Sequence, residues 1–180
     1  MFKFNRQEIK QILKINECEL EALSAEKKIE FELKEHEYLY SLPVEYGLFG
    51  NQLKTDLIEW YVEKHSYAGT NEPQAQNSID ALESLAYKIL LPIFSNMGNP
   101  IISYGFTSFT LKNFIQKNAP SGTAPFLDQH SAYEVNSKGK QICSRGGAAC
   151  DFYVEGVAAS DIVRYIVNNL SFDRIYFYGN

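Results

Sequence analysis

The chain has few cysteines, no long apolar run and no excess of positive charge. Its 180 residues include 3 cysteines, an odd number that does not form an even disulfide framework. Lys and Arg number 17 against 22 Asp and Glu, and the net charge of -5 disfavours a general binder of nucleic acid or anionic membranes. No run approaches the length of a membrane span, and the first residues lack the apolar core of a secretory signal. These absences favour a cytoplasmic protein with reduced thiols.

The composition that remains is typical of a folded globular protein. Hydrophobic residues make up 45% of the chain and aromatic residues 14%, and 180 residues are enough for one domain with a substantial core. A polar stretch containing Gly and Pro at 68–77 separates an N-terminal section from the rest. We therefore expect a mainly helical extension over 1–75 and a functional domain over 76–180.

In the N-terminal section the apolar positions are only partly helical in spacing. Residues 4–40 predict a short helix, a break, and then a helix or strand, with Glu and Lys on a solvated face. Gly47 and Gly50 predict a turn, and a helix is expected over 53–65.

The second section begins with a helix over 79–93 that Asn77 or Ser78 would cap and Pro92 would kink or end. The other expected elements are strands over 101–104, 152–154 and 172–178, and helices over 111–115 and 161–170. Short strands lie between few helices, and no βαβ alternation is visible. This pattern predicts an α+β fold, with a small, mostly antiparallel sheet packed by helices.

The segment from Asp128 to Asp151 carries the candidate chemistry. His130 and Asp151 are residue types that bind zinc, and the small residues 146–149 let the backbone pass close to a neighbouring group. A structural alternative stays open. Residues 146–149 would then form a tight turn before a core strand, and Asp128 and His130 a loop-capping pair.

Three short motifs occur in a fixed order after Ser78. Residues 103–108 read SYGFTS, 128–130 read DQH, and 147–151 read GAACD. Their order resembles that of the zinc peptidases of the D-Ala-D-Ala carboxypeptidase type, which share the Hedgehog/DD-peptidase fold and include dipeptidases and phage endolysins. The resemblance implies that His130 and Asp151 bind one zinc ion. It also implies that a metal-bound water attacks an amide bond of a small peptide or peptidoglycan fragment.

Further roles are expected near the metal. Glu134 lies four residues after His130 and would share its face in a helix, so it would be a general base or ligand, with a structural carboxylate as the alternative. Arg145 would stand in for the family's substrate-gripping arginine, whose position is Thr107 here. The side chains expected to line the substrate pocket are Tyr104, Thr107, Ser108 and Gln129.

The chain departs from the family around its metal ligands. His130 and Asp151 are separated by an insertion, which a hairpin is expected to absorb because surface insertions cost little closure entropy. The chain reaches Asn180 where the family's final segment, with its third histidine ligand, would begin. Catalytic zinc needs about three protein ligands. The candidates for the third are Cys143, Cys150, Glu134, His65 or a group from another chain. For the two cysteines the alternatives are a buried free thiol or a bond between Cys143 and Cys150.

Two function classes follow. The first is a zinc-dependent hydrolase of peptide amide bonds. The second is a non-catalytic binding or assembly module on the same fold, which recognises a small molecule, a peptide or a protein partner, with 1–75 as a candidate partner surface. The missing export signal favours the second class, because peptidoglycan lies outside the cytoplasm. A phage enzyme released through a separate pore would avoid that objection. Neither class calls for nucleic acid or a membrane as partner.

Overall fold

The computed structural model describes residues 44–124 and 128–177. The chain divides into two compact units. One spans Leu48–Ala158, and the described part of the other is 44–47 and 159–177. The boundary expected after residue 75 falls inside the first unit, and the elements expected over 4–40 lie outside the described residues.

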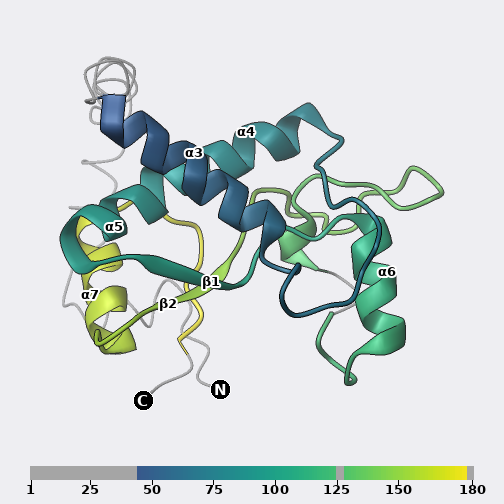
Figure 1. Ribbon diagram of the computed structural model, residues 1–180. Coiled ribbons are helices and arrows are strands. Elements are labelled where there is room, and N and C mark those ends of the chain that lie inside the picture. The colour runs from purple at the N-terminus through teal and green to yellow at the C-terminus, as the bar shows by residue number, and fades with distance from the viewer. Residues whose placement is uncertain (1–43, 125–127, 178–180) are drawn as a thin grey trace. The chain divides into compact units, whose positions relative to one another are not determined.

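The larger unit has an α+β fold built around two antiparallel strands (Figure 1). β1 (Pro100–Tyr104) pairs with β2 (Asp151–Val154), so that Pro100 lies opposite Val154 and Tyr104 lies opposite Asp151. The register shifts between Ile102 and Tyr104, which leaves an extra residue on β1 as a β-bulge. The α+β class and a small antiparallel sheet are therefore confirmed for the described residues.

Helix α3 (Val44–Glu59) begins well before residue 53. Gly47 and Gly50 lie inside it, so the turn expected there is wrong. The structure shows why residue 50 is a glycine: a Cβ on Gly50 would lie 2.2 Å from the ring of Tyr87. The glycine thus permits close helix packing.

The helix expected over 79–93 continues past Pro92 in three pieces. These are α4 (Gln76–Leu85), the π-helical turn η1 (Ala86–Leu90) and α5 (Leu91–Met97). Proline cannot donate the usual backbone hydrogen bond, and its ring crowds the preceding turn. A wider π turn directly before Pro92 accommodates both effects, so the chain stays helical.

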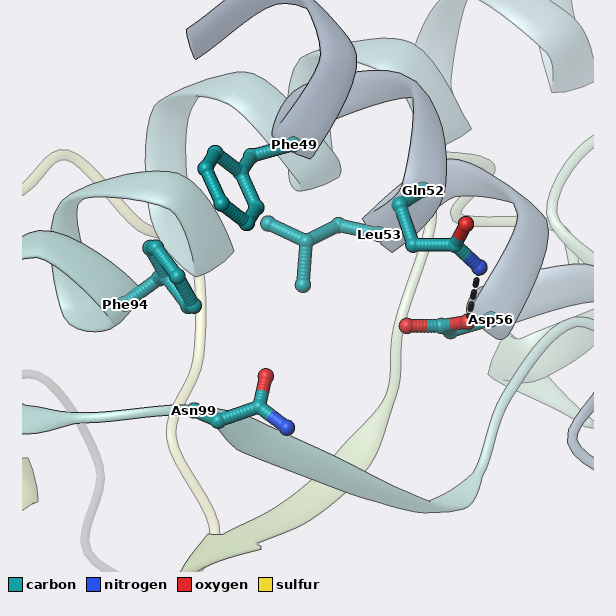
Figure 2. A pocket seen from close by; sticks show the side chains of 6 residues that line it. All are labelled: Phe49, Gln52, Leu53, Asp56, Phe94 and Asn99. Atoms are coloured by element: carbon teal, nitrogen blue, oxygen red, sulfur yellow. Dashed lines mark hydrogen bonds between the residues drawn. The ribbon is translucent and has the colours of Figure 1, made fainter. Parts of the chain in front are cut away.

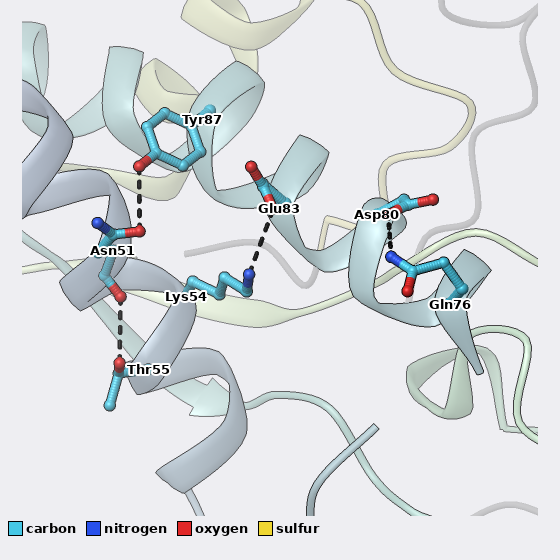
Figure 3. Close-up of polar contacts among 7 residues, drawn as sticks. All are labelled: Asn51, Lys54, Thr55, Gln76, Asp80, Glu83 and Tyr87. Atoms are coloured by element: carbon cyan, nitrogen blue, oxygen red, sulfur yellow. Dashed lines mark hydrogen bonds and ion pairs between the residues drawn. The ribbon is translucent and has the colours of Figure 1, made fainter. Parts of the chain in front are cut away.

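Side-chain contacts join α3 to the helices that follow it (Figure 3). Lys54 Nζ lies 3.3 Å from Glu83 Oε2, and the Tyr87 hydroxyl lies 3.2 Å from Asn51 Oδ1. These partly exposed pairs orient the helices, while the apolar core supplies most of the stability. The largest fully buried apolar side chains are Phe106, Leu57, Leu82, Leu90, Ile93, Leu111 and Ile115.

Helix α6 (Phe109–Asn118) is longer than the expected 111–115. It begins after Ser108, whose Oγ accepts a hydrogen bond from the Leu111 N–H at 3.3 Å. Its buried side chains include Leu111, Ile115 and Lys112. Because Ser108 is its N-cap, the helix starts directly after the SYGFTS motif and fixes the end of that segment.

In the second unit, α7 (Ala159–Asn169) buries Ile162 and Ile166, one turn apart, as the spacing of apolar residues predicts. Within 172–177 only Phe177 takes part in a β-bridge, so the strand expected there is wrong for these positions. Aromatic content favours a strand only where a pleated partner surface is available. No helix in the described ranges combines the length and apolarity needed to span a bilayer.

Candidate metal centre

His130 and Asp151 lie next to each other in the fold. His130 is in the short turn η2 (Gln129–Ser131), Asp151 begins β2, and His130 Nε2 is 3.8 Å from Asp151 Oδ1. Zinc–ligand distances of about 2.0–2.2 Å with tetrahedral angles place two donor atoms about 3.4 Å apart. A zinc ion would therefore fit between these atoms after a small adjustment. The two side chains are 15% and 47% exposed, so the centre opens to solvent on the Asp151 side.

A small hairpin accounts for the long sequence separation of the two residues. Val135 and Gln141 form an antiparallel bridge. Asn136 closes the tip: its Oδ1 accepts the backbone N–H groups of Lys138 at 2.9 Å and Lys140 at 3.1 Å. The expected hairpin is confirmed over 135–141, and a loop over 142–150 leads from it to Asp151.

Tyr104 connects the two halves of the centre. It is the cross-strand partner of Asp151, and its ring packs edge-on against the His130 ring with centroids 4.6 Å apart. The same ring contacts Trp60, with centroids 4.2 Å apart. The backbone of His130 is held as well, because its carbonyl accepts the Thr107 N–H at 3.0 Å. The pair is thus built on β1, β2 and η2 rather than on one loop.

Asp128, which bonds to both His130 and Tyr104, is completely buried, with 0% exposure. Its Oδ1 accepts the backbone N–H of His130 at 3.0 Å, and its Oδ2 accepts the Tyr104 hydroxyl at 3.4 Å. Burial raises the pKa of Asp128, against the opposing effects of His130, Lys112 and Tyr104. Burial, followed by the charge of Asp128, raises the pKa of Tyr104 far above its usual range. The loop-capping interpretation of Asp128 and His130 is confirmed.

Gln129 ties the turn at His130 to the glycine loop. Its Nε2 donates to the carbonyls of Gly146 and, at 3.3 Å, Gly147, while its Oε1 accepts the Cys143 thiol at 3.3 Å. Gly146 has a φ of 63°, and a Cβ there would lie 2.2 Å from the Tyr133 ring. The glycine is needed both for its backbone conformation and for this close approach. The Gln129 amide is thus used inside the loop.

Glu134 holds the start of α4. The side chain is buried, and its Oε1 accepts the backbone N–H groups of Gln74 at 3.0 Å and Ala75 at 3.1 Å. The expected cap by Asn77 or Ser78 is wrong: the N-cap is Ala75, and Ser78 Oγ instead accepts the Tyr133 N–H at 3.1 Å. The structural alternative for Glu134 thus has direct support from these two hydrogen bonds.

The other side chains expected at the substrate pocket lie in different surroundings. Thr107 is fully buried, and its hydroxyl donates to the Gly105 carbonyl at 3.3 Å. Ser108 is nearly buried as the cap of α6. Arg145 is exposed and immediately precedes Gly146. Of the four residues predicted to bind substrate, Tyr104 is the one whose ring contacts the His130 side chain.

A third metal ligand is not found among residues 44–124 and 128–177, which contain no group of three or more His, Cys, Asp or Glu side chains able to hold a metal ion. His65 packs edge-on against Trp60, with ring centroids 5.6 Å apart. In the metal-free protein, burial, then the charge of Asp151, raises the pKa of Cys150 to about 12. Within the same ranges, His130 Nδ1 is buried and has no hydrogen-bond partner. The described residues fit a zinc ion as a two-ligand half-site.

Two further residues, Asn71 and Trp60, bond to the backbone next to the segment 103–108, and the sequence patterns did not single them out. Asn71, inside the polar stretch 68–77, is 2% exposed. Its Nδ2 donates to the carbonyls of Ile58 and Phe106 at 2.8 Å each, and its Oδ1 accepts the Ser108 N–H at 2.8 Å. Trp60 donates to the Phe106 carbonyl at 2.7 Å. The sequence feature that could have pointed to Trp60 is that it is the single tryptophan of the chain.

A separate cavity of about 330 Å³ opens between α3 and α5 (Figure 2). It is lined by Phe49, Gln52, Leu53, Asp56, Phe94 and Asn99. Asn99 precedes β1, whereas Tyr104 ends it beside Asp151. At about 3.3 Å per residue, these two positions are about 16 Å apart along the strand. The cavity is therefore distinct from the metal centre.

Comparison with known proteins found no matching protein-family model, no similar curated protein and no similar solved structure. The function is therefore argued from the motifs and the geometry of the centre.

Proposed function

We propose that the chain is a zinc-dependent hydrolase of amide bonds in small peptides, such as peptidoglycan fragments, with a fold of the zinc D-Ala-D-Ala carboxypeptidase type. The supporting observation is the 3.8 Å approach of His130 Nε2 to Asp151 Oδ1 across a long insertion. An imidazole and a carboxylate at this separation match the donor types and spacing that zinc prefers. The half-exposed side chain of Asp151 leaves one side of the pair open to water and substrate.

The residues of the chain would prepare this centre in distinct ways. Bound zinc would act as a Lewis acid and lower the pKa of its water. His130 would contribute a neutral imidazole, held by its contact with Tyr104 and by two backbone hydrogen bonds. Asp151 would contribute a negative charge from the first position of a strand, which limits its movement. The Tyr104 hydroxyl donates to Asp128, which holds the ring that packs against His130.

Elemental analysis of the full chain, after dialysis that removes unbound metal, tests this proposal. We expect about one zinc per wild-type chain, which requires a third ligand besides His130 and Asp151, and loss of that zinc in His130→Ala and Asp151→Ala. Asp56→Ala is the matched control, because it removes a carboxylate from the other cavity and should leave the zinc content unchanged. Full zinc retention by Asp151→Ala would contradict the assignment. Zinc-loaded wild type is then assayed for release of amino acids from short peptides that contain D-residues.

A second candidate function is a non-catalytic binding module with the same centre. It is favoured by the carboxylate of Glu134, which is already bonded to the backbone N–H groups of Gln74 and Ala75, and by the buried position of Thr107. Without a free general base, hydrolysis would lose about 10²–10⁴-fold in rate. Calorimetry with the same D-amino-acid peptides separates the two functions. Saturable binding without product release supports the module, and turnover supports the hydrolase.

A further inference from the structure

We propose that Asp128 is a positioning residue for the candidate metal centre: it orients His130 through the backbone and Tyr104 through the hydroxyl, with Lys112 as its countercharge. The inference deepens the proposed function and rests on it for the metal. Asp128 does not face the pair itself. It acts through the two residues that do, one a ligand and the other the ring packed against that ligand.

The hydrogen bonds of Asp128 carry this inference. One carboxylate oxygen is committed to the His130 N–H at 3.0 Å and the other to the Tyr104 hydroxyl at 3.4 Å. A single rigid group thereby fixes both the backbone turn that carries the imidazole and the ring that packs edge-on against it. Tyr104 also faces Asp151 across the strands, so Asp128 is linked to both candidate ligands.

The burial of Asp128 indicates that the arrangement serves more than stability. A fully buried carboxylate is costly unless it is paired and hydrogen-bonded, and well-packed apolar groups often stabilise such a position as well or better. Lys112, on α6, is 4% exposed and interacts electrostatically with Asp128. An aspartate and a lysine are thus both buried, and the hydrogen bonds of Asp128 to His130 and Tyr104 explain the presence of the aspartate.

Four variants of the full chain separate geometry from charge. Lys112→Met provides a background without the buried positive charge. In that background, Asp128→Asn keeps a group of the same shape that still accepts the His130 N–H and still pairs with Tyr104. Asp128→Ala removes both bonds. Ser78→Ala is the control, because Ser78 is also fully buried and also accepts one backbone N–H, from Tyr133.

Two measurements are made on each folded variant. Zinc affinity is obtained by competition with a chromophoric chelator, and the ring-proton NMR shifts of His130, assigned with His130→Ala, report its contact with Tyr104 without metal. Asp128→Ala/Lys112→Met is expected to bind zinc about 10–100-fold more weakly, the usual effect of removing a group that orients a metal ligand. Its His130 shifts should move towards solvent values. Asp128→Asn/Lys112→Met, Lys112→Met and Ser78→Ala should stay close to wild type in both measurements.

Each result has a defined meaning. Wild-type zinc affinity in Asp128→Ala/Lys112→Met would overturn the inference, as would equal weakening by the Asn and Ala substitutions. If wild type binds no zinc, the proposed function fails. The inference then stands or falls on the His130 shifts, which must respond to the Ala substitution and not to the Asn substitution.

Discussion

Two regions of the larger unit differ in how completely their polar groups are hydrogen-bonded. Around Phe106, the backbone N–H donates to Leu57 at 2.7 Å, and the carbonyl accepts both Trp60 Nε1 at 2.7 Å and Asn71 Nδ2 at 2.8 Å. We call Leu57, Trp60, Asn71 and Phe106 the clamp. At the metal centre, by contrast, Asp151 is half-exposed, and His130 Nδ1 is buried without a partner in the part of the chain that the structure describes. The clamp pairs its polar groups and serves stability, whereas the centre leaves the Asp151 carboxylate open to a ligand.

The largest expected effect tests the structural half of this contrast. Phe106→Ala removes a fully buried ring from the clamp, and we expect the free energy of unfolding to fall by about 3–5 kcal/mol in chemical denaturation. Phe49→Ala is the control, because Phe49 is 45% exposed and should lose much less. Similar losses in the two variants would show that the clamp is not the stabilising region.

A pair of glycine variants gives a smaller effect and probes the loop at the metal centre. Gly146→Ala and Gly147→Ala both place a Cβ on a left-handed backbone, with φ of 63° and 74°, at a cost of about 1–2 kcal/mol each. Only at Gly146 would the Cβ also meet a ring, that of Tyr133, whereas space is open at Gly147. Denaturation should therefore show a loss that is larger for Gly146→Ala by about 1–3 kcal/mol. Equal losses would mean that Tyr133 moves aside freely.

The smallest expected effect is a pH dependence at the edge of the clamp. Burial, followed by the charge of Lys64, lowers the pKa of His65, which packs against Trp60. The folded protein therefore favours the neutral imidazole, and this contribution to stability is fully present above the ordinary pKa of about 6.5. It is lost as the pH falls through the lower folded value. Between pH 7.5 and 5.5, metal-free wild type should lose more stability than His65→Gln, and parallel losses would contradict this.

Local patterns were sufficient where a local property decides the structure. Strand-forming residues predicted β1 and β2 to within one residue at each start, and the apolar spacing at Ile162 and Ile166 predicted α7. The insertion between His130 and Asp151 predicted a hairpin for a reason of chain entropy. None of these predictions required knowledge of a distant partner.

The predictions that failed depended on contacts between distant residues. Gly50 looks like a turn signal in sequence, but its missing side chain makes room for Tyr87. Asn71 looks like part of a polar linker, yet its three hydrogen bonds lie inside the clamp. Propensity ranks residues by their usual surroundings, and it carries no information about which ring or carbonyl the fold will bring to them.

In the candidate site, too, the successful predictions depended on local patterns and the open ones on distant contacts. His130 and Asp151 were singled out by residue type and motif, and the fold brings them together. For Glu134 the sequence left a catalytic and a structural role open. Residue type alone does not distinguish a carboxylate that accepts backbone N–H groups from one that activates water. The two backbone N–H groups of Gln74 and Ala75 that it accepts come from a segment far away in the chain.

The hairpin between His130 and Asp151 makes a convenient point of attachment. Its tip, at 137–140, is exposed and is held by hydrogen bonds within the hairpin itself, mainly to Asn136. Residues can be added there at little entropic cost, because the base of the hairpin is held by the hydrogen bond from the Ile142 N–H to the Glu134 carbonyl. A fluorescent label or an affinity handle inserted at the tip would thus extend from the surface without touching the core. The segment that separates the two candidate ligands in sequence becomes a point of attachment that leaves both of them in place.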